Sequence, residues 1–490
     1  MPATDTPSFL VTGGNPLAGT VHVGGAKNSA LKLMAASVMA PGPTTLENVP
    51  LISDVRIMEQ VLETLGATVT HAPDGDPHTL LIDTSDLTSH ETPYELVAQM
   101  RASISILGPL ITRFGCARVA MPGGCQIGAR KLDMHIASLE ALGVSFGMDH
   151  GYISATTPNG LAGAEVILDF PSVGATENLM MASVCAEGVT CIRNAASEPE
   201  IADLASYLVE MGACIDGAGT PNITIIGVDE LHPAARHTVV GDRIEAGTYL
   251  VAGAIGGGPV TVTGADPAHL AMAIKKLQQM GCTVVCTAPD PDIVDEQNTI
   301  SATGRGGAAG RGAAPGETTA PSITVERDSA LLAVDIQTLP HPGFPTDLQA
   351  QFMVLAAIAQ GDSVITENVF ENRFMFAAEL GRMGADIRID GHHALVSGTD
   401  HLSGAPVSST DLRGGAALVL AGLAARGTTT VTGVHHIDRG YEDYAGKLRS
   451  LGADVTRTDA PDVARTDPAA APAAPAAAAQ SAAPEAAARS

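Results

Sequence analysis

Aromatic residues are scarce in this chain of 490 residues, which has no tryptophan and only 3% Phe, Trp and Tyr together. A core built without large rings has to be aliphatic and rich in alanine. The same scarcity leaves no row of aromatic side chains on which nucleic-acid bases could stack. The remaining composition, with 45% hydrophobic and 16% charged residues, is that of a soluble globular protein long enough for two or three domains.

Positive charge is also in short supply, because 27 Lys and Arg stand against 53 Asp and Glu, a formal net charge of -26. This balance excludes a general polyanion-binding surface, so we expect no nucleic-acid partner. The N-terminal residues lack the features of a signal peptide, and the apolar runs are too short to span a bilayer. Seven cysteines without a CxxC pair fit a reducing compartment. We expect a cytoplasmic protein with no membrane partner.

Common metal and phosphate motifs are missing as well. The sequence has no HExxH motif, and its adjacent histidine pairs lack the spacing of a common metal site. It has no phosphate loop of the GxxxxGK[ST] type, and the glycine-rich segment 304–310 is low in complexity. We expect neither a metal nor a cofactor, and any bound phosphate has to be held by dispersed cations.

What the sequence does contain is a repeat. Six segments consist of a hydrophobic residue, a glycine and usually a small residue, and each lies between a helical pattern and a strand-like run. The glycine is therefore predicted to end a helix each time. A second glycine, 23 to 28 residues upstream, separates an apolar helix from a β-branched strand. The helix-ending glycines are Gly66, Gly143, Gly212, Gly281, Gly384 and Gly452.

These six units predict an α/β fold with three units in each half. Two segments stand outside the units. Residues 303–321, rich in Gly, Ala and Arg, predict a disordered insertion. Residues 459–490, almost wholly Ala and Pro, cannot build a core and predict a disordered tail. Neither segment is expected to carry chemistry.

In several units, the apolar helix that precedes the second glycine is predicted to begin with a cation. A positive side chain at a helix N-terminus opposes the macrodipole unless an anion lies there too, so these cases indicate a bound anion. At the other starts, such as Thr176 with Glu177, capping alone explains the polar residues. The four cations are Lys27, Arg101, Arg243 and Arg413.

Two segments are candidates for catalysis. Residues 121–135 combine three glycines with a thiol, a guanidinium, a carboxylate and an imidazole, and predict a mobile lid that presents Cys125 near Arg130. Asp347 follows three prolines and a glycine, and is either a first-turn helix acid or a general base on a rigid approach. Thr346 is expected to cap the helix that begins there.

A series of motifs over roughly residues 8–457 resembles the UDP-N-acetylglucosamine 1-carboxyvinyltransferase family of enolpyruvyl transferases. The resemblance implies two inverted α/β domains (an inside-out α/β barrel) with six repeats of a βαβαβ-type unit, three per domain. The motifs include Gly25-Ala-Lys27-Asn28, Pro122-Gly-Gly-Cys125-Gln-Ile-Gly-Ala-Arg130, Phe170-Pro-Ser-Val-Gly174, Asp242-Arg-Ile-Glu-Ala-Gly247, Pro342-Gly-Phe-Pro-Thr-Asp347 and His436-Ile-Asp-Arg439-Gly-Tyr-Glu442.

The resemblance also implies where the domains divide. One domain would span residues 22–241 and carry the Cys125 loop. The other would be discontinuous, joining residues 8–21 to residues 242–457. The second domain would carry Asp347, Arg413 and Arg439.

The activity implied is transfer of the enolpyruvyl group of phosphoenolpyruvate to the 3-hydroxyl of UDP-N-acetylglucosamine, with release of phosphate, through a tetrahedral ketal. This reaction is the first committed step of peptidoglycan synthesis, and thus serves the cell wall, cell shape and cell division. The partners are then the two small-molecule substrates, and we expect a monomer. Because Cys125 is present, alkylation by fosfomycin is expected too.

The resemblance assigns roles to individual residues. Cys125 would be the general acid and Asp347 the base that deprotonates the sugar hydroxyl, with Lys27, Asn28 and Arg439 completing the catalytic group. Asp411 would support the intermediate. The residues implied to bind phosphoenolpyruvate are Lys27, Asn28, Arg101, Cys125, Arg130, Arg413 and Arg439. Those implied to bind UDP-N-acetylglucosamine are Arg101, Arg130, Lys131, Leu132, Asp133, Ser172, Val173, Gly174, Asp347 and Val369.

One departure and two alternatives accompany this interpretation. Lys131 stands where the family usually has a proline, which puts the contact with the uracil ring in doubt. The sister transferase acting on shikimate 3-phosphate shares the fold, but the Cys125 loop and residues 170–174 argue against it. A non-catalytic paralogue that binds UDP-sugar and regulates cell-wall synthesis is the other alternative, against which the full set of candidate residues argues.

Overall fold

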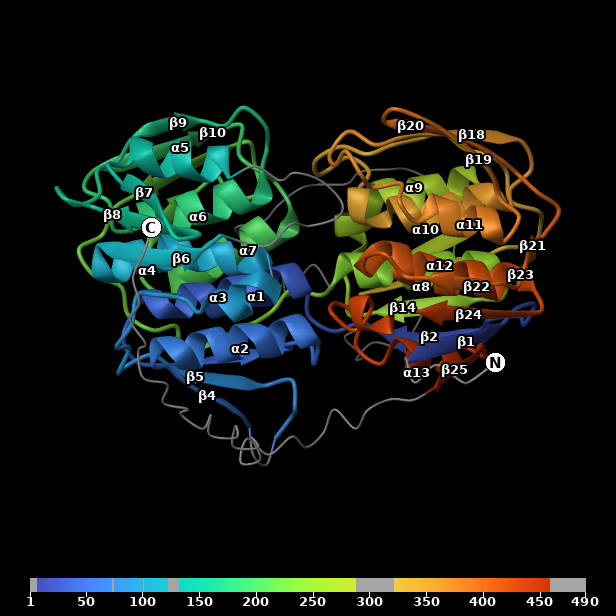
Figure 1. The fold of residues 1–490 in the computed structure, drawn as a ribbon, viewed down its shortest axis with the longest axis horizontal. Helices are drawn as coiled ribbons and strands as arrows, with labels where there is room; N and C mark the ends of the chain where they lie inside the picture. Colours follow the sequence, from blue (N-terminus) through green and yellow to red (C-terminus); the bar gives the residue numbers. More distant parts are fainter. Residues whose placement is uncertain (1–6, 73–74, 100, 122–131, 288–320, 459–490) are drawn as a thin grey trace, which may run out of the picture.

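The computed structural model describes residues 7–72, 75–99, 101–121, 132–287 and 321–458. Two lobes lie side by side, the first blue to green and the second mainly yellow to red (Figure 1). Each lobe has its own core, one built from residues 30–239 and the other from residues 9–23 together with 244–455. The predicted tail, and the predicted insertion except for Pro321, lie outside the described residues.

The first lobe contains three units, each made of a helix, a strand, a second helix and two further strands. The first unit comprises α1 (Lys27–Ala36), η1 (Ser37–Met39), β3 (Pro43–Glu47), α2 (Ser53–Leu65), β4 (Thr68–His71) and β5 (Leu80–Asp83). The second comprises α3 (Tyr94–Gln99), η2 (Arg101–Ile106), α4 (Leu107–Phe114), β6 (Cys116–Ala120), α5 (Asp133–Ala141), β7 (Ser145–Asp149) and β8 (Tyr152–Thr156). The third comprises β9 (Glu165–Ile167), α6 (Val173–Ser183), β10 (Val189–Arg193), α7 (Pro199–Glu210), β11 (Cys214–Asp216), β12 (Asn222–Ile226) and β13 (Arg236–Thr238).

The second lobe repeats this plan and takes in the first two strands of the chain, β1 (Ser8–Thr12) and β2 (Gly19–His22). Its first unit comprises α8 (Arg243–Gly256), β14 (Val260–Thr263), η3 (Pro267–Leu270), α9 (Ala271–Gln279), β15 (Thr283–Thr287) and β16 (Ser322–Glu326). The next comprises β17 (Ile336–Gln337), η4 (Thr346–Leu348), α10 (Gln349–Ala357), β18 (Asp362–Thr366), α11 (Ala377–Arg382), β19 (Asp386–Asp390) and β20 (His393–Ser397). The last comprises β21 (Leu402–Ser403), β22 (Pro406–Ser408), α12 (Leu412–Ala424), β23 (Ala425–Arg426), β24 (Thr428–Thr432), η5 (Val434–His436), α13 (Tyr444–Ser450) and β25 (Asp454–Thr458).

The sheets of the six units share one strand order. The first strand of a unit lies beside the third, and the third beside the second, as in β3-β5-β4 and β24-β1-β25. A linking strand pairs in parallel with the first strand of the unit that follows it, as β9 does with β10. In the first lobe β13 pairs back with β3, and in the second β2 pairs with β14. Each lobe thereby closes into a ring of three units, which confirms the predicted six-unit α/β fold.

The helices that open the units form the interior of each lobe. Every residue of α10 is buried, as are eleven consecutive residues of α12 from Arg413 to Leu423. A helix that is apolar on all sides has to be surrounded by protein, so the sheets lie outside it. Figure 1 shows these helices between outer sheets, which is the inside-out arrangement. Within the described ranges, no helix is long and apolar enough to cross a bilayer.

The six helix-ending glycines behave as predicted. All of them have φ between 92° and 106°, a left-handed conformation that favours glycine. At the end of α2, for example, Gly66 N–H donates to the carbonyl of Glu63 and Ala67 N–H to that of Leu62. One expected helix start was wrong. Helix α6 begins at Val173, not at Thr176, because Ser172 accepts a hydrogen bond from Ala175 N–H and caps the helix one turn earlier.

Candidate active site

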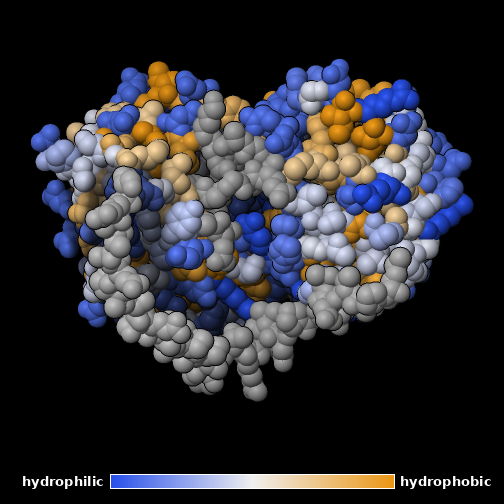
Figure 2. Space-filling model, viewed as in Figure 1, coloured by the Kyte–Doolittle hydropathy of each residue, from blue (hydrophilic) through white to orange (hydrophobic). Residues whose placement is uncertain are grey.

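Helices α1 and α8, which open the first unit of each lobe, begin where the lobes meet. Over the described residues the chain crosses between the lobes twice, and the crossings are joined by a bridge between Gly25 and Gly241. Ala26 N–H donates to Val240 O at 2.6 Å, and Asp242 N–H to the carbonyl of Gly24 at 2.9 Å. Figure 2 shows hydrophilic side chains gathered along the line between the lobes. A polar interface is therefore built around the first turns of buried helices.

Lys27 opens α1 and lies at this interface, nearly buried. Its Nζ is 2.6 Å from Oδ2 of Asp54, which lies in the first turn of α2 and is 2% exposed. Arg439 of the second lobe donates to the same carboxylate through Nε at 2.9 Å and Nη2 at 3.2 Å. One carboxylate therefore joins two of the expected phosphoenolpyruvate ligands across the interface.

The protonation of this group follows from its burial and its charges. Burial alone would raise the pKa of Asp54, but the positive charges of Lys27 and Arg439 outweigh it and lower that pKa. Burial lowers the pKa of Lys27, and the charge of Asp54 opposes this shift. The stability of the Lys27 cation therefore depends on a neighbouring anion.

Asp347 lies between two arginines of its own lobe. Arg373 Nη2 donates to Oδ1 at 2.6 Å, and Arg413 donates to Oδ2 through Nε at 3.3 Å and Nη2 at 3.2 Å. Both guanidinium groups are buried, whereas the Asp347 side chain keeps an exposure of 25%. The carboxylate is thus oriented by fixed donors and still accessible. Arg413 also lies over the ring of Tyr441, 5.3 Å from its centroid.

The cations at helix N-termini are therefore matched by protein carboxylates. Besides the pairs of Lys27 and Arg413, Arg243 at the start of α8 donates to Glu200 at 3.1 and 3.3 Å. The expectation that each such cation needs a bound anion was too strong, because side chains distant in sequence supply negative charge here. Arg101 does open η2, but its side chain lies outside what the structure describes.

Asp411 and Asn28 occupy first turns as well. Asp411 is the N-cap of α12 and accepts from the backbone N–H groups of Arg413 and Gly414 at 3.0 and 2.9 Å. Asn28 is the second residue of α1, and its side chain is exposed next to buried Lys27. Both residues therefore lie at helix starts of the interface, one in each lobe.

A single carboxylate organises the surroundings of Val369 and Asp347. Glu367 accepts from the N–H groups of Val369 at 2.8 Å and Phe370 at 3.2 Å through Oε1, and from Thr346 Oγ1 at 2.9 Å through Oε2. The prediction that Thr346 caps the helix was wrong, because its hydroxyl is directed to Glu367 and Pro345 is the N-cap. Glu367 thereby fixes the residue next to Asp347.

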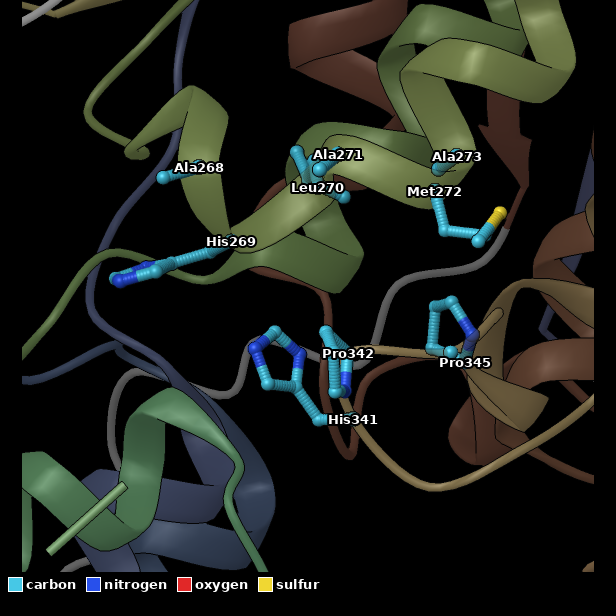
Figure 3. A pocket seen from close by; sticks show the side chains of 10 residues that line it. Ala268, His269, Leu270, Ala271, Met272, Ala273, His341, Pro342 and Pro345 are labelled. Carbon is cyan, nitrogen blue, oxygen red and sulfur yellow. The ribbon is translucent and has the colours of Figure 1, made fainter. Parts of the chain in front are cut away.

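The approach to Asp347 packs tightly against η3 and α9 of the same lobe. His341, Pro342 and Pro345 face residues of η3 and α9 (Figure 3). The cavity between them is about 10 Å³, room for at most one water. Burial lowers the pKa of His341 to about 4, so its imidazole is neutral. This cavity is too small for a substrate.

The expected sugar-nucleotide residues of the first lobe cluster at two helix starts. Ser172, Val173 and Gly174 form the start of α6, and Asp133 opens α5 after Leu132. A Cβ on Gly174 would lie 3.1 Å from the ring of His135 in α5, so the two starts are in contact. Cys125, Arg130 and Lys131 lie outside the described residues.

Three site residues were missed by the sequence analysis: Asp54, Glu367 and Arg373. Asp54 resembles any first-turn acid, and only its contacts with Lys27 and Arg439 distinguish it. Glu367 and Arg373 are charged residues in the segment after β18, and only their contacts with Thr346 and Asp347 distinguish them. In the described part of the chain, no group of three or more His, Cys, Asp or Glu side chains is placed to hold a metal ion.

Comparison with known proteins places this fold in a class. Residues 11–448 match the family model described as EPSP synthase (3-phosphoshikimate 1-carboxyvinyltransferase). The enolpyruvyl transferase NikO from Streptomyces tendae superposes with a TM-score of 0.77 at 26% identity, over 93% of this chain and 100% of that one. The class is that of the enolpyruvyl transferases.

Curated relatives narrow the class further. The UDP-N-acetylglucosamine 1-carboxyvinyltransferase of Solibacter usitatus is 48% identical over 92% of this chain and 99% of the relative. The UDP-N-acetylglucosamine 1-carboxyvinyltransferase 2 of Staphylococcus saprophyticus is 47% identical with the same coverage. The chain belongs to the UDP-N-acetylglucosamine 1-carboxyvinyltransferase family.

Proposed function

We propose that this protein transfers the enolpyruvyl group of phosphoenolpyruvate to the 3-hydroxyl of UDP-N-acetylglucosamine and releases phosphate. The observation that carries the proposal is the identity of 47–48%, over almost the whole chain, to relatives named for this reaction. The interface supports it, because Lys27, Arg439 and Arg413 gather positive charge where a highly charged anionic substrate would bind.

The reaction then proceeds by addition and elimination. In the first step C3 of phosphoenolpyruvate takes a proton from Cys125, while Asp347 removes the proton of the sugar hydroxyl and its oxygen bonds to C2. The resulting tetrahedral ketal loses a proton from C3, and the bond from C2 to the phosphate oxygen breaks. Phosphate and the enolpyruvyl ether leave. Arg373 and Arg413 support the role of Asp347, because their hydrogen bonds orient its carboxylate.

The two lobes are proposed to act as domains, one of residues 22–241 and the other of residues 8–21 with 242–457. Phosphoenolpyruvate would lie between Lys27 of one and Arg439 of the other, with Arg101, Arg130 and Arg413 adding charge. UDP-N-acetylglucosamine would lie along residues 130–133, 172–174, Asp347 and Val369. Closure of the lobes on this sugar nucleotide predicts a smaller radius of gyration in solution scattering, and an unchanged profile would contradict it.

The deciding experiment is phosphate release from phosphoenolpyruvate with two acceptors in parallel. We expect release with UDP-N-acetylglucosamine and none above background with shikimate 3-phosphate. The opposite preference would assign the protein to the sister activity after which the family model is named. Binding of UDP-N-acetylglucosamine without release would assign it to a regulatory paralogue.

Cys125 provides a second test. As the thiol of the proposed lid it should be alkylated by the epoxide fosfomycin, giving one adduct on the peptide that contains it and loss of phosphate release. Cys282 offers a matched comparison, because burial raises the pKa of its thiol to about 11 and it should stay unmodified. The proposed biological role is the first committed step of peptidoglycan synthesis in the cytoplasm, which supports cell shape and division.

A further inference from the structure

The segment from Asp438 to Glu442 in the second lobe lies against the loop that precedes α2 in the first lobe. Helix α2 has no side-chain cap at Ile52. The N–H of Ser53, the first residue of the helix, donates instead to the carbonyl of Asp438 at 3.1 Å, and the Ser53 hydroxyl donates to the same oxygen at 3.3 Å. An N-terminal amide of α2 is therefore satisfied by the opposite lobe.

Glu442 makes the second contact between these segments. Its Oε2 accepts from Leu51 N–H at 3.1 Å, and its Oε1 is 2.9 Å from Nε2 of His78. The other ring nitrogen of His78 is 2.9 Å from Oδ1 of Asp76, and the His78 carbonyl accepts from Val49 N–H at 2.8 Å. The carboxylate of Glu442 thus holds two separate loop segments of the first lobe.

Arg439 is carried by the same short segment. It lies between Asp438 and Glu442 in the chain, just as its partner Asp54 follows Leu51 and Ser53. The segment also passes close to Lys27. A Cβ on Gly440 would lie 3.2 Å from Cδ of Lys27. Contacts on both sides of Arg439 therefore decide where its guanidinium stands relative to Lys27.

We infer that Glu442 is a positioning residue, which holds Arg439 at the interface by binding Leu51 and His78 of the opposite lobe. The backbone carbonyl of Asp438 supplies the other contact with the first lobe, through Ser53. The side chain of Asp438 accepts two hydrogen bonds of 2.7 Å from Arg457 of its own lobe. Side-chain substitution leaves that backbone contact in place, so Glu442 is the contact that mutation can remove. The kinetic part of this inference rests on the proposed function, since it takes Arg439 as a ligand of phosphoenolpyruvate.

The test is the variant Glu442→Ala, with Asp454→Ala as a control on an exposed carboxylate of β25. We expect the KM for phosphoenolpyruvate to rise about tenfold or more, with kcat and the KM for UDP-N-acetylglucosamine within about twofold of wild type. Glu442→Gln should recover most of the loss, because its amide can accept from Leu51 and donate to His78. A wild-type KM in Glu442→Ala, or a fall in kcat alone, would overturn the inference.

Two further measurements separate this inference from failure of the proposed function. Amide hydrogen exchange needs no activity, and the amide of Leu51 should exchange faster in Glu442→Ala than in wild type. Unchanged exchange there would overturn the contact itself.

His78→Ala removes one of the two contacts of Glu442 and should raise the KM for phosphoenolpyruvate by a smaller factor. In the double variant the effects should be less than additive, and full additivity would count against a shared contact.

Discussion

Asp347 receives hydrogen bonds on both carboxylate oxygens, one from Arg373 and the other from Arg413. Arg373 lies in the segment after β18 and Arg413 at the start of α12, so two separate units of the second lobe orient this side chain. A group held in this way has lost its rotational freedom before any substrate binds, which is what the proposed role of Asp347 as a base requires.

The variant Asp347→Asn tests this base. Asparagine keeps the shape of the side chain but cannot take a proton, so kcat should fall by about 10²–10⁴-fold. Steady-state phosphate release measures the effect. Asp390→Asn, at an exposed position of β19, should leave kcat unchanged. A kcat near wild type in Asp347→Asn would remove Asp347 from the mechanism.

Asp54→Asn addresses the shared carboxylate. Lys27 and Arg439 would lose their common anion, and the pKa of Lys27, already lowered by burial, would fall further. We expect kcat/KM for phosphoenolpyruvate to drop by about tenfold to a hundredfold, the scale of hydrogen bonds to charged groups. Glu63→Gln, an exposed acid of the same helix, is the matched control. Equal kinetics for the two variants would show that Asp54 is not needed.

His237 predicts a pH dependence of stability. Burial opposes its protonation, but hydrogen bonds and charges of Asp203 and Glu210 outweigh burial and raise its pKa above 6.5. The folded state then binds the proton more tightly, so its contribution is complete below pH 6.5 and is lost as the pH rises through the raised value.

Denaturant unfolding of wild type and His237→Gln at several pH values measures this contribution. The difference in free energy of unfolding should be largest below pH 6.5 and should shrink above it. His150→Gln, with a side chain 85% exposed, is the control and should change the free energy of unfolding by less than about 0.5 kcal/mol. A difference for His237→Gln that grows with pH would contradict the assignment.

Gly25→Ala tests the crossing between the lobes. A Cβ at Gly25 would lie 1.9 Å from the carbonyl oxygen of Asn48, so the crossing segment would have to move away from the loop after β3. We expect a loss of about 1–3 kcal/mol in the free energy of unfolding. Gly24→Ala is an adjacent control, because a Cβ there meets nothing within 4 Å. Similar melting temperatures for both variants would argue against a tight crossing.

The fold could be predicted from the sequence further than the site. Glycine alone adopts the conformation at Gly66 and its five counterparts without strain, so each marked a helix end in the sequence. The start of α6 was missed because both Ser172 and Thr176 are residue types that cap helices. The contact of Asp54 with Arg439 spans 385 residues, and no local pattern reports such a contact.

The pairing of β1 and β2 has a consequence for how the protein is made. In the first lobe every strand pairs within residues 43–238, so that lobe can complete its sheets as soon as this stretch leaves the ribosome. In the second lobe β1 pairs with β24 and β25, the last strand of the described chain. Strand β1 must therefore wait, unpaired, until β24 and β25 have emerged, and a chain stopped before β24 leaves β1 without its partners.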